Sequence, residues 1–301
     1  MIVVAGSLNY DIILKVKRMP REGETMTCDS ASTAAGGKGA NQAVQAAKLG
    51  VPSFMIGAVG ADNMGDYLRE EATKYGLDIS HVKRSWTSTG MGCVHALEDG
   101  RVFATINRGA NYDLTTRDID AAEDLFARSK ILILQNEIPH EVNMYAADLA
   151  RKHGLKVLYN AAPAMPEHKD MLAKADVVIV NEGEASDYLG VEIAAPEDAS
   201  REGLKAGGAF GNVWVITMGG QGSVICAEGR SETVKPYKVD AVETTGAGDS
   251  YIGGLAYALT QGMDVFSAAH FATKCSALTV CGIGAQPSMP TLAQVHERFC
   301  E

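Results

Sequence analysis

The stretch ILILQNEIPHEVNMYAADLARKHG, residues 131 to 154, begins with an apolar run and continues into a segment with helical periodicity. The apolar run covers Ile131 to Leu134, and the periodic segment covers residues 141–153. Gly154 follows directly, and a glycine in this position is typical of a helix C-cap. The stretch therefore predicts one strand followed by one helix, which is the unit from which parallel sheets are built.

The same unit recurs along the chain. Further apolar runs lie at residues 2–5, 157–159, 177–180 and 213–217. Further segments with helical spacing cover residues 39–49, 64–75, 116–127, 182–189, 196–207, 248–261, 265–280 and 292–299. This alternation predicts an α/β fold with a doubly wound, mostly parallel sheet that helices cover on both faces.

Two regions, residues 12–33 and 87–108, interrupt the alternation. In the second region, Glu98-Asp99-Gly100 separates two apolar runs, and an Asp-Gly in such a place is a strong hairpin signal. We expect both regions to form a small β-sheet lid inserted into a single domain that spans residues 1–301. Such a sheet must close over a ligand or pack against a second subunit. A further hairpin is expected from residues 223–227 and 232–235 around Glu228-Gly229.

The composition excludes several classes of function. The chain has 301 residues with 46% hydrophobic and 21% charged residues, and no apolar run approaches the roughly 18 residues that span a bilayer. A formal net charge of -10 without a basic cluster argues against nucleic-acid binding. The six cysteines lack the spacing of zinc sites or disulfide frameworks. Because Met1 to Gly6 reads as a first strand without a basic leader, we expect a cytoplasmic protein.

A glycine-rich segment near the C-terminus carries the first sign of chemistry. Residues 243–250 read ETTGAGDS and lead into a helical pattern. Small residues at a helix start allow backbone N–H groups to face an anion such as phosphate. Asp249 beside that anion site is suited to take a proton from an attacking hydroxyl. The alternative is that Asp249 only caps the helix.

A second glycine-rich segment, GGKGANQA at residues 36–43, also leads into a helix. Its spacing fits neither a P-loop nor a dinucleotide fingerprint. The glycines permit close approach of a ligand, and Lys38 and Asn41 add hydrogen-bond donors suited to the hydroxyls of a small polar molecule. The alternative is a helix entry with a surface lysine.

Polar side chains also follow several predicted strands. Asn9 and Asp11 come after the first strand and point to the same side of an extended chain, which suits a vicinal diol, although an Asx turn is the alternative. Similar clusters follow three later strands: Glu137; Asn181 with Glu184; and Thr217 to Gly222. Because open α/β sheets bind ligands at the carboxyl ends of their strands, we expect these clusters to share one site, rather than to be separate solvated loops.

The segments at 36–41 and 244–249 resemble the two signatures of the ribokinase-like (PfkB) family of carbohydrate kinases. The resemblance runs from Gly6 to about Pro290. It implies a doubly wound α/β sandwich with a small β lid, and a homodimer joined through that lid. It also implies transfer of the γ-phosphoryl group of ATP to a primary hydroxyl of a sugar.

The resemblance implies roles for single residues as well. The sugar hydroxyls would be held by Asn9, Asp11, Gly37, Lys38, Asn41 and Glu137, with Ile106 of the lid over the apolar side. Asp249 would be the base, and N–H groups of Gly246, Ala247 and Gly248 would stabilise the transferring phosphoryl group. Asn181, Thr217, Gly219, Gly220, Gly222 and Gly248 would meet ATP phosphates, with adenine near Thr273.

The implied metals are Mg²⁺, with Glu184 holding one of its waters, and K⁺. The K⁺ site would consist of Glu243, Thr245, Thr279, Gly282, Gly284 and Ser288, mostly through backbone oxygens. Glu243 replaces the family's usual aspartate, and its extra methylene can move the carboxylate out of coordination range. Tyr10, between two implied sugar ligands, would either stack on the substrate or pack beneath the lid.

We therefore expect an ATP-dependent kinase for a pentose, with conversion of D-ribose to ribose 5-phosphate as the reaction. Within the family, deoxyribose, a ketohexose or a nucleoside is the alternative substrate, because few pocket residues set the choice. A sugar-binding regulator without activity is the alternative of another class. It would require a missing catalytic part, and every part is present.

Overall fold

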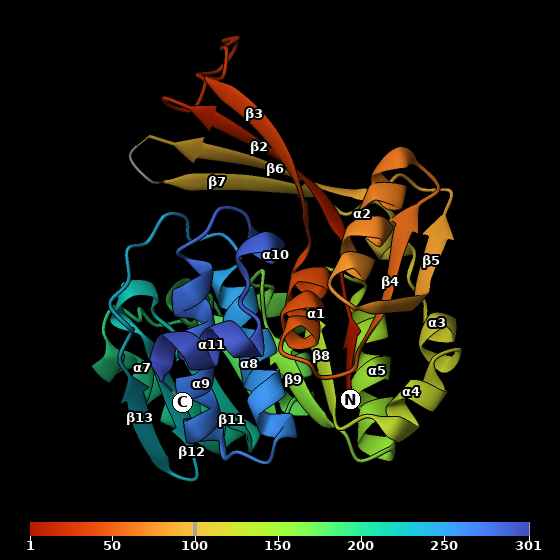
Figure 1. Ribbon diagram of the computed structural model, residues 1–301. Helices are drawn as coiled ribbons and strands as arrows, with labels where there is room; N and C mark the ends of the chain where they lie inside the picture. Colours follow the sequence, from red (N-terminus) through yellow and green to blue (C-terminus); the bar gives the residue numbers. More distant parts are fainter. Residues whose placement is uncertain (99–100, 301) are drawn as a thin grey trace.

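The computed structural model describes residues 1–98 and 101–300, and their strands form two separate sheets (Figure 1). The larger sheet has nine strands in the order β13-β12-β11-β10-β9-β8-β1-β4-β5. In chain order they are β1 (Ile2–Ala5), β4 (Ser53–Gly60), β5 (Asp78–Ser85), β8 (Ile131–Gln135), β9 (Lys156–Asn160), β10 (Val177–Asn181), β11 (Val213–Thr217), β12 (Ser223–Ala227) and β13 (Arg230–Val234).

All neighbours from β11 to β5 pair in parallel, whereas β12 is antiparallel both to β11 and to β13, its partner in the edge hairpin. Glu228 and Gly229, which join the two edge strands, both have positive φ, the backbone of the tight turn that suits a hairpin. The α/β fold with a mostly parallel sheet is therefore confirmed. The second strand of this hairpin begins at Arg230, two residues before the expected start.

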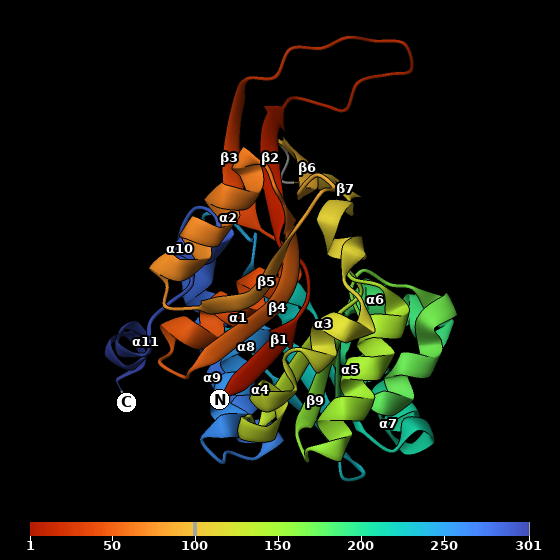
Figure 2. The same cartoon turned by 90° about the vertical axis from the view of Figure 1, so that its right-hand side faces the viewer.

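Helices cover both faces of the larger sheet (Figures 1 and 2). On one face lie α1 (Lys38–Lys48), α2 (Asn63–Lys74), α8 (Ala247–Thr260), α9 (Val265–Thr279) and α11 (Leu292–Phe299). On the other lie α3 (Thr116–Asp120), α4 (Glu123–Arg128), α5 (His140–Lys152), α6 (Glu182–Leu189) and α7 (Pro196–Phe210). Shorter helices are α10 (Ala285–Ser288) and the 3₁₀ segments η1 (Gly109–Asp113), η2 (Pro166–Lys174) and η3 (Gly219–Gln221).

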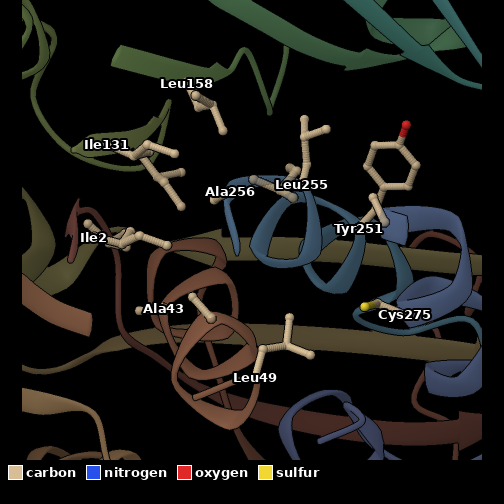
Figure 3. Packing of buried hydrophobic residues seen from close by; sticks show 14 of the residues in the cluster. Ile2, Ala43, Leu49, Ile131, Leu158, Tyr251, Leu255, Ala256 and Cys275 are labelled. Carbon is tan, nitrogen blue, oxygen red and sulfur yellow. The ribbon is translucent and has the colours of Figure 1, made fainter. Parts of the chain in front are cut away.

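The period of two along each strand divides the core between these two faces. In β1, Ile2 and Val4 pack on the α1/α8 side, and Val3 and Ala5 pack on the α5 side. Figure 3 shows the first of these layers, with Ile2 and Ile131 from the sheet facing Leu255 of α8. The strands read as continuous apolar runs because both of their faces are buried.

The smaller sheet has four strands in the order β3-β2-β6-β7 and projects from one edge of the molecule (Figure 1). Its strands are β2 (Asn9–Val16), β3 (Ser30–Gly36), β6 (Gly90–Leu97) and β7 (Val102–Asn107). The loop between β2 and β3 extends farthest from the larger sheet (Figure 2). Trp86, in the turn between β5 and β6, is fully exposed, whereas Trp214 on β11 is fully buried. The expected small sheet is confirmed, and its strands begin as early as Asn9.

One expected helix is divided in the structure, two strands were not expected, and one expected turn falls on residues that the structure does not describe. The helix expected over residues 116–127 is broken at Ala121 and Ala122 into α3 and α4, and no glycine or proline signals the break. Strands β4 and β5 were not predicted, because Gly57 and Gly60 dilute the pattern of the first and the second is a polar edge strand. Asp99 and Gly100 of the expected hairpin turn lie outside the described residues.

The strand order reverses at β1. The chain moves from β1 to β4 and β5 on one side, and later to β8, β9, β10 and β11 on the other. At such a switch point the loops after the two neighbouring strands diverge and leave a crevice at their carboxyl ends. None of the helices in residues 1–98 and 101–300 has the length and hydropathy of a membrane-spanning segment.

Candidate active site

The crevice at the switch point brings together the loops that follow β1 and β8. Ser7, directly after β1, donates a short hydrogen bond from Oγ to Glu137 Oε2. The same carboxylate oxygen accepts the backbone N–H of Lys38 at 3.2 Å. Glu137 is only 7% exposed, so three separate segments of the chain meet at one buried carboxylate.

The smaller sheet supplies a second wall. Asn9 at the start of β2 is buried, and its Oδ1 accepts a hydrogen bond of 2.7 Å from Asn111 Nδ2. A cavity of about 270 Å³ lies between this wall and the larger sheet, and its lining includes Asn9, Ile106, Tyr112 and Glu137. Ile106 thus lies over the cavity from β7, as expected for the lid. Tyr10 faces away and packs edge-on against Tyr67 of α2, with ring centroids 5.5 Å apart.

Asp11 lies on β2 with a glycine on each side. A Cβ atom added to Gly36 of β3 would lie 2.0 Å from Asp11 Oδ2, and one added to Gly92 of β6 would lie 2.3 Å from Oδ1. Burial raises the pKa of Asp11 to about 7, and the negative charges of Glu137 and Asp249 add to the effect. The carboxylate therefore occupies a slot that only glycine neighbours leave open.

The segment from Gly37 to Asn41 forms the start of α1. Gly37 has φ of 90°, a conformation that favours glycine, and it places the next residues against the loop after β1. Ala40 N–H donates to Ser7 O at 2.9 Å. Burial acts to lower the pKa of Lys38, but the surrounding carboxylates of Asp249, Glu137, Glu184 and Asp11 outweigh it, and the pKa is raised. Lys38 is therefore held as an ammonium ion at the centre of an acidic cluster.

Asp249 lies in the first turn of α8, after Gly246 with φ of 78°. Both oxygens of its carboxylate accept side-chain amides of α1: Oδ2 from Asn41 and Oδ1 from Gln42, each at 2.9 Å. Burial raises the pKa of Asp249, and Lys38 and the two amides oppose this shift without cancelling it. A raised pKa makes the carboxylate a stronger base.

At the expected anion site before and at the start of α8, one of the three backbone N–H groups is already hydrogen-bonded. Ala247 N–H donates to Thr244 O at 3.2 Å. Among the described residues, no acceptor is found for the N–H groups of Gly246 and Gly248. These two amides, at the positive end of the α8 dipole, are available to a phosphate.

Asn181 and Glu184 form a capping box at the start of α6. Asn181 Oδ1 accepts the N–H of Glu184, and Glu184 Oε2 accepts the N–H of Asn181, both at 2.8 Å. Burial raises the pKa of Glu184, with Asn181 N–H and Lys38 acting in the opposite direction. Glu184 therefore has a structural task and also contributes charge to the cluster around Lys38.

The turn after β11 is open on its outer side. Gly219 and Gly220 are exposed, and a Cβ atom on either would meet no atom within 4 Å. Gly222 closes the turn through its carbonyl, which accepts Met218 N–H at 2.8 Å, and Thr217 Oγ1 donates to Val180 O at 3.4 Å. Thr273 is buried on α9, where its hydroxyl donates to Ala269 O at 2.8 Å.

The residues of the implied K⁺ site converge from two loops. Glu243 Oε2 accepts Gly284 N–H at 3.0 Å, and Glu243 N–H donates to Val280 O at 3.2 Å. Ser288 Oγ donates a short hydrogen bond to Gly284 O, and Thr279 Oγ1 donates to Ser250 Oγ at 2.7 Å. Gly282 lies against Ser288, and Thr245 is exposed. The longer side chain of Glu243 is thus already bound to the opposite loop.

Sequence reasoning missed four residues that hold the others in place: Ser7, Gln42, Asn111 and Gln135. Each is buried and hydrogen-bonded to an expected site residue or to its immediate support. Gln42 and Ser7 could have been suspected from their places in the two glycine-containing segments. Gln135 and Asn111 carried no signal, because contact over such separations depends on the fold.

The arrangement combines acceptors for hydroxyl groups, one base, one ammonium ion and free backbone N–H groups. Asn9, Asp11 and Glu137 offer oxygens, and Lys38 lies within electrostatic reach of Asp11, Glu137 and Asp249. Such a set can hold a polyhydroxylated molecule, remove a proton from one hydroxyl and stabilise an anionic group beside it.

Comparison with known proteins agrees with this chemistry. The ribokinase of Schizosaccharomyces pombe is 37% identical to the chain, with 99% of this chain and 97% of the relative covered. The deoxyribokinase of Salmonella typhi is 33% identical, with 98% and 97% covered. The structure of Arabidopsis thaliana ribokinase complexed with ribose and ATP superimposes with a TM-score of 0.88 at 30% identity, covering 98% of this chain and 97% of that one.

A family model extends over nearly the entire sequence. Residues 1–292 match the model of the pfkB family carbohydrate kinases, which includes both glycine-rich segments and both walls of the cavity. Together with the fold and the carboxylate-centred site, this match decides the classification. The chain belongs to the pfkB family of carbohydrate kinases.

Proposed function

We propose that this chain transfers the γ-phosphoryl group of ATP to the primary hydroxyl of ribose and so produces ribose 5-phosphate. The observation that carries the proposal is the meeting of Asp249, at the start of α8, with hydroxyl-binding side chains on β2 and after β8 around Lys38. Relatives named ribokinase at 37% and 33% identity support ribose as the sugar.

In the proposed complex, ribose lies in the cavity between the two sheets. Asn9, Asp11 and Glu137 accept hydrogen bonds from its secondary hydroxyls. Asn9 and Glu137 line the cavity, and Asp11 lies within electrostatic reach of Glu137. Gly37, Lys38 and Asn41 add donors from the start of α1. Ile106 covers the apolar side of the ring from the lid.

The proposed chemical step is proton removal followed by phosphoryl transfer. The primary hydroxyl donates its proton to a carboxylate oxygen of Asp249, and the hydroxyl oxygen attacks the γ-phosphorus. The bond between the γ-phosphorus and the oxygen that bridges it to the β-phosphorus breaks, and ADP leaves with that oxygen. The negative charge on the transferring group is stabilised by the N–H groups of Gly246 and Gly248, which have no acceptor among the described residues, with Ala247 at the same helix start. The Lys38 ammonium adds a full positive charge on the side of the sugar.

We place ATP across the ends of β10 and β11. Asn181, Thr217 and the exposed turn through Gly219, Gly220 and Gly222 would meet its phosphates, with adenine toward Thr273 on α9. Mg²⁺ would be held through a water molecule by Glu184, because one of its carboxylate oxygens is not used by the capping box. Such an ion, when bound, neutralises the charge of the phosphates.

We also propose a monovalent cation site between Glu243 and the loop at residues 279–288. Backbone and hydroxyl oxygens converge there, as a hard cation requires. Because the Glu243 carboxylate already accepts Gly284 N–H, we expect K⁺ to increase the rate only modestly. Assays in which K⁺ is replaced by tetramethylammonium measure this increase.

The face of the small sheet turned away from Asp11 carries Ile12, Leu14, Met91 and Phe103, according to the pairing register. We propose that two chains form a homodimer by packing these faces together, since an apolar sheet face is unstable in water. We place the protein in the cytoplasm, where ATP is available.

A coupled assay for ADP formation, run with ribose, deoxyribose, fructose and nucleosides, tests the substrate. The variant Asp249→Asn tests the base: kcat should fall by about 10²- to 10⁴-fold, while ribose binding measured by calorimetry is kept. Turnover of Asp249→Asn near that of the unaltered enzyme would overturn the assignment of the base.

Deoxyribose is the second candidate, because a relative named deoxyribokinase is 33% identical over nearly the full length. The two sugars differ by one hydroxyl, so a site that hydrogen-bonds this hydroxyl should strongly prefer ribose. A kcat/KM for deoxyribose equal to or above that for ribose would replace our first choice by the second.

A further inference from the structure

The carboxylate of Asp249 accepts hydrogen bonds from two neighbouring residues of α1, and these residues differ in their surroundings. Asn41, which donates to Oδ2, borders the site and is also implied in sugar binding. Gln42, which donates to Oδ1, is fully buried beneath the site and has no access to a ligand. A bound ligand can therefore contact Asn41 directly, whereas Gln42 is shielded from it.

The amide of Gln42 is fixed in one orientation by three partners. Its Nε2 donates to Asp249 Oδ1 at 2.9 Å and to Asn160 Oδ1 at 3.1 Å, and its Oε1 accepts Gln135 Nε2 at 2.7 Å. A flipped amide would turn its oxygen toward two acceptor oxygens and its NH₂ group toward another donor. The hydrogen-bond inventory thus permits one arrangement only.

The partners behind Gln42 belong to the larger sheet. Gln135 ends β8 and Asn160 ends β9, and Asn160 Nδ2 donates to Ile179 O of β10 at 3.2 Å. Gln135 is fully buried, and its Oε1 has no hydrogen-bond partner among the described residues. An orphaned buried oxygen costs free energy, so this amide chain is maintained against a local penalty.

From these contacts we propose that Gln42, supported by Gln135 and Asn160, is a positioning residue that holds Oδ1 of Asp249 in place for proton abstraction. The proposal rests on the proposed kinase function. This positioning role differs from a purely structural role, because the side chain of Gln42 contacts the base directly. Through Gln42, the side chains of Gln135 and Asn160 connect the larger sheet to Asp249. Lys38 of α1, Asp11 of β2 and Glu184 of α6 are the charged groups that act on Asp249 from other directions.

The test replaces Gln42 with methionine, which has a similar length and no amide. We expect kcat to fall by about 10- to 100-fold, because a misplaced reacting group typically costs that much, while the KM values for ribose and ATP change by less than about two-fold. The acidic limb of the kcat–pH profile should move to higher pH, since an amide that stabilises ionised Asp249 is lost. Gln135→Met should show a weaker form of the same pattern.

Gln45→Met is the matched control. Gln45 lies one turn later on α1, is also fully buried, and is hydrogen-bonded to Pro290 O and Ser250 Oγ instead of Asp249. We expect it to lower the melting temperature about as much as Gln42→Met and to retain most of kcat. Equal losses of kcat in both variants, or an unchanged kcat and pH profile in Gln42→Met, would overturn the positioning role.

If Gln42→Met folds poorly, the kcat and the pH profile of Gln135→Met decide the question, because that variant keeps Gln42 and removes one of its supports. If both single variants fold, the double variant tests whether the two residues act in series. Gln42 and Gln135 act in series, so the double variant should be no slower than Gln42→Met alone. Additive losses would contradict the series arrangement. If the unaltered enzyme does not phosphorylate ribose, the proposed function fails. If the unaltered enzyme phosphorylates ribose and Gln42→Met has the same kcat and pH profile, only the positioning role of Gln42 is refuted.

Discussion

Asp11 is a carboxylate whose charge state changes near neutral pH. Burial and the nearby charges of Glu137 and Asp249 raise its pKa to about 7, while Lys38 and the N–H of Gly92 act against this shift. Above that pH the ionised group can accept hydrogen bonds with both oxygens, as the proposed role in sugar binding requires. Below it, one oxygen carries a proton and is lost as an acceptor.

We therefore expect the KM for ribose to rise several-fold as the pH falls from about 8 to about 6, because a raised pKa leaves Asp11 increasingly protonated over this range. Initial rates over a range of ribose concentrations measure this change. Asp11→Asn should show a high KM that no longer depends on pH in this window. A flat KM in the unaltered enzyme would show that Asp11 does not bind the sugar as an anion.

At the scale of elements, the slot for Asp11 depends on the two strands beside β2. Gly92→Ala would place a methyl group 2.3 Å from Asp11 Oδ1, so the carboxylate must move. We expect the KM for ribose to rise by about ten-fold or more, since displacement of a binding group by even a small distance is costly. Steady-state kinetics with ribose and ATP varied separately measure the effect.

Gly208→Ala is the control for this substitution. Gly208 lies in α7, and an added Cβ atom would meet nothing within 4 Å. It should leave both KM values unchanged and slightly stabilise the helix. If Gly92→Ala kinetics match those of Gly208→Ala, the slot does not control sugar binding.

The elements differ in how well the sequence predicts them. Strands buried on both faces, such as β8 with Ile131 to Leu134, are predicted correctly, because burial demands an uninterrupted apolar run. The edge strand β5, with Lys83 and Arg84, is not predicted, because pairing on a single side leaves little hydrophobic signal. The break between α3 and α4 is invisible for a related reason, since tertiary packing and not composition decides it.

At the scale of the whole molecule, the apolar face of the small sheet that is turned away from Asp11, which carries Leu14 and Phe103, predicts self-association. Analytical ultracentrifugation should show a dimer that dissociates on dilution. Leu14→Lys places a charge on that face and should shift the protein to monomers. It should also raise the KM for ribose, because Asn9 and Asp11 lie on the same strand.

Val191→Lys is the comparison for the dimer experiment. Val191 is an exposed apolar residue, 42% accessible, in the segment between α6 and α7, away from the small sheet. This variant should remain a dimer with unchanged kinetics. A monomeric protein at all concentrations, or a dimer that Leu14→Lys does not weaken, would contradict pairing through this face.

Only those site residues that belong to short sequence motifs could be predicted from the sequence. Lys38 and Asp249 stand in glycine-rich segments whose backbone demands are visible in the sequence. The contacts of Asp249 with Asn41 and Gln42 join residues about two hundred positions apart, and only the packing of α1 against α8 creates them. The same is true of Asn111 beside Asn9, where η1 meets the start of β2.

The contrasting surroundings of the two tryptophans give the molecule a built-in optical probe. A soluble quencher such as acrylamide reaches the indole of Trp86 and not that of Trp214, so the two emissions can be separated without a label. Because Trp86 precedes β6 where the chain enters the small sheet, its quenching reports on that junction as sugar is added. The emission of Trp214 reports independently on the integrity of the core.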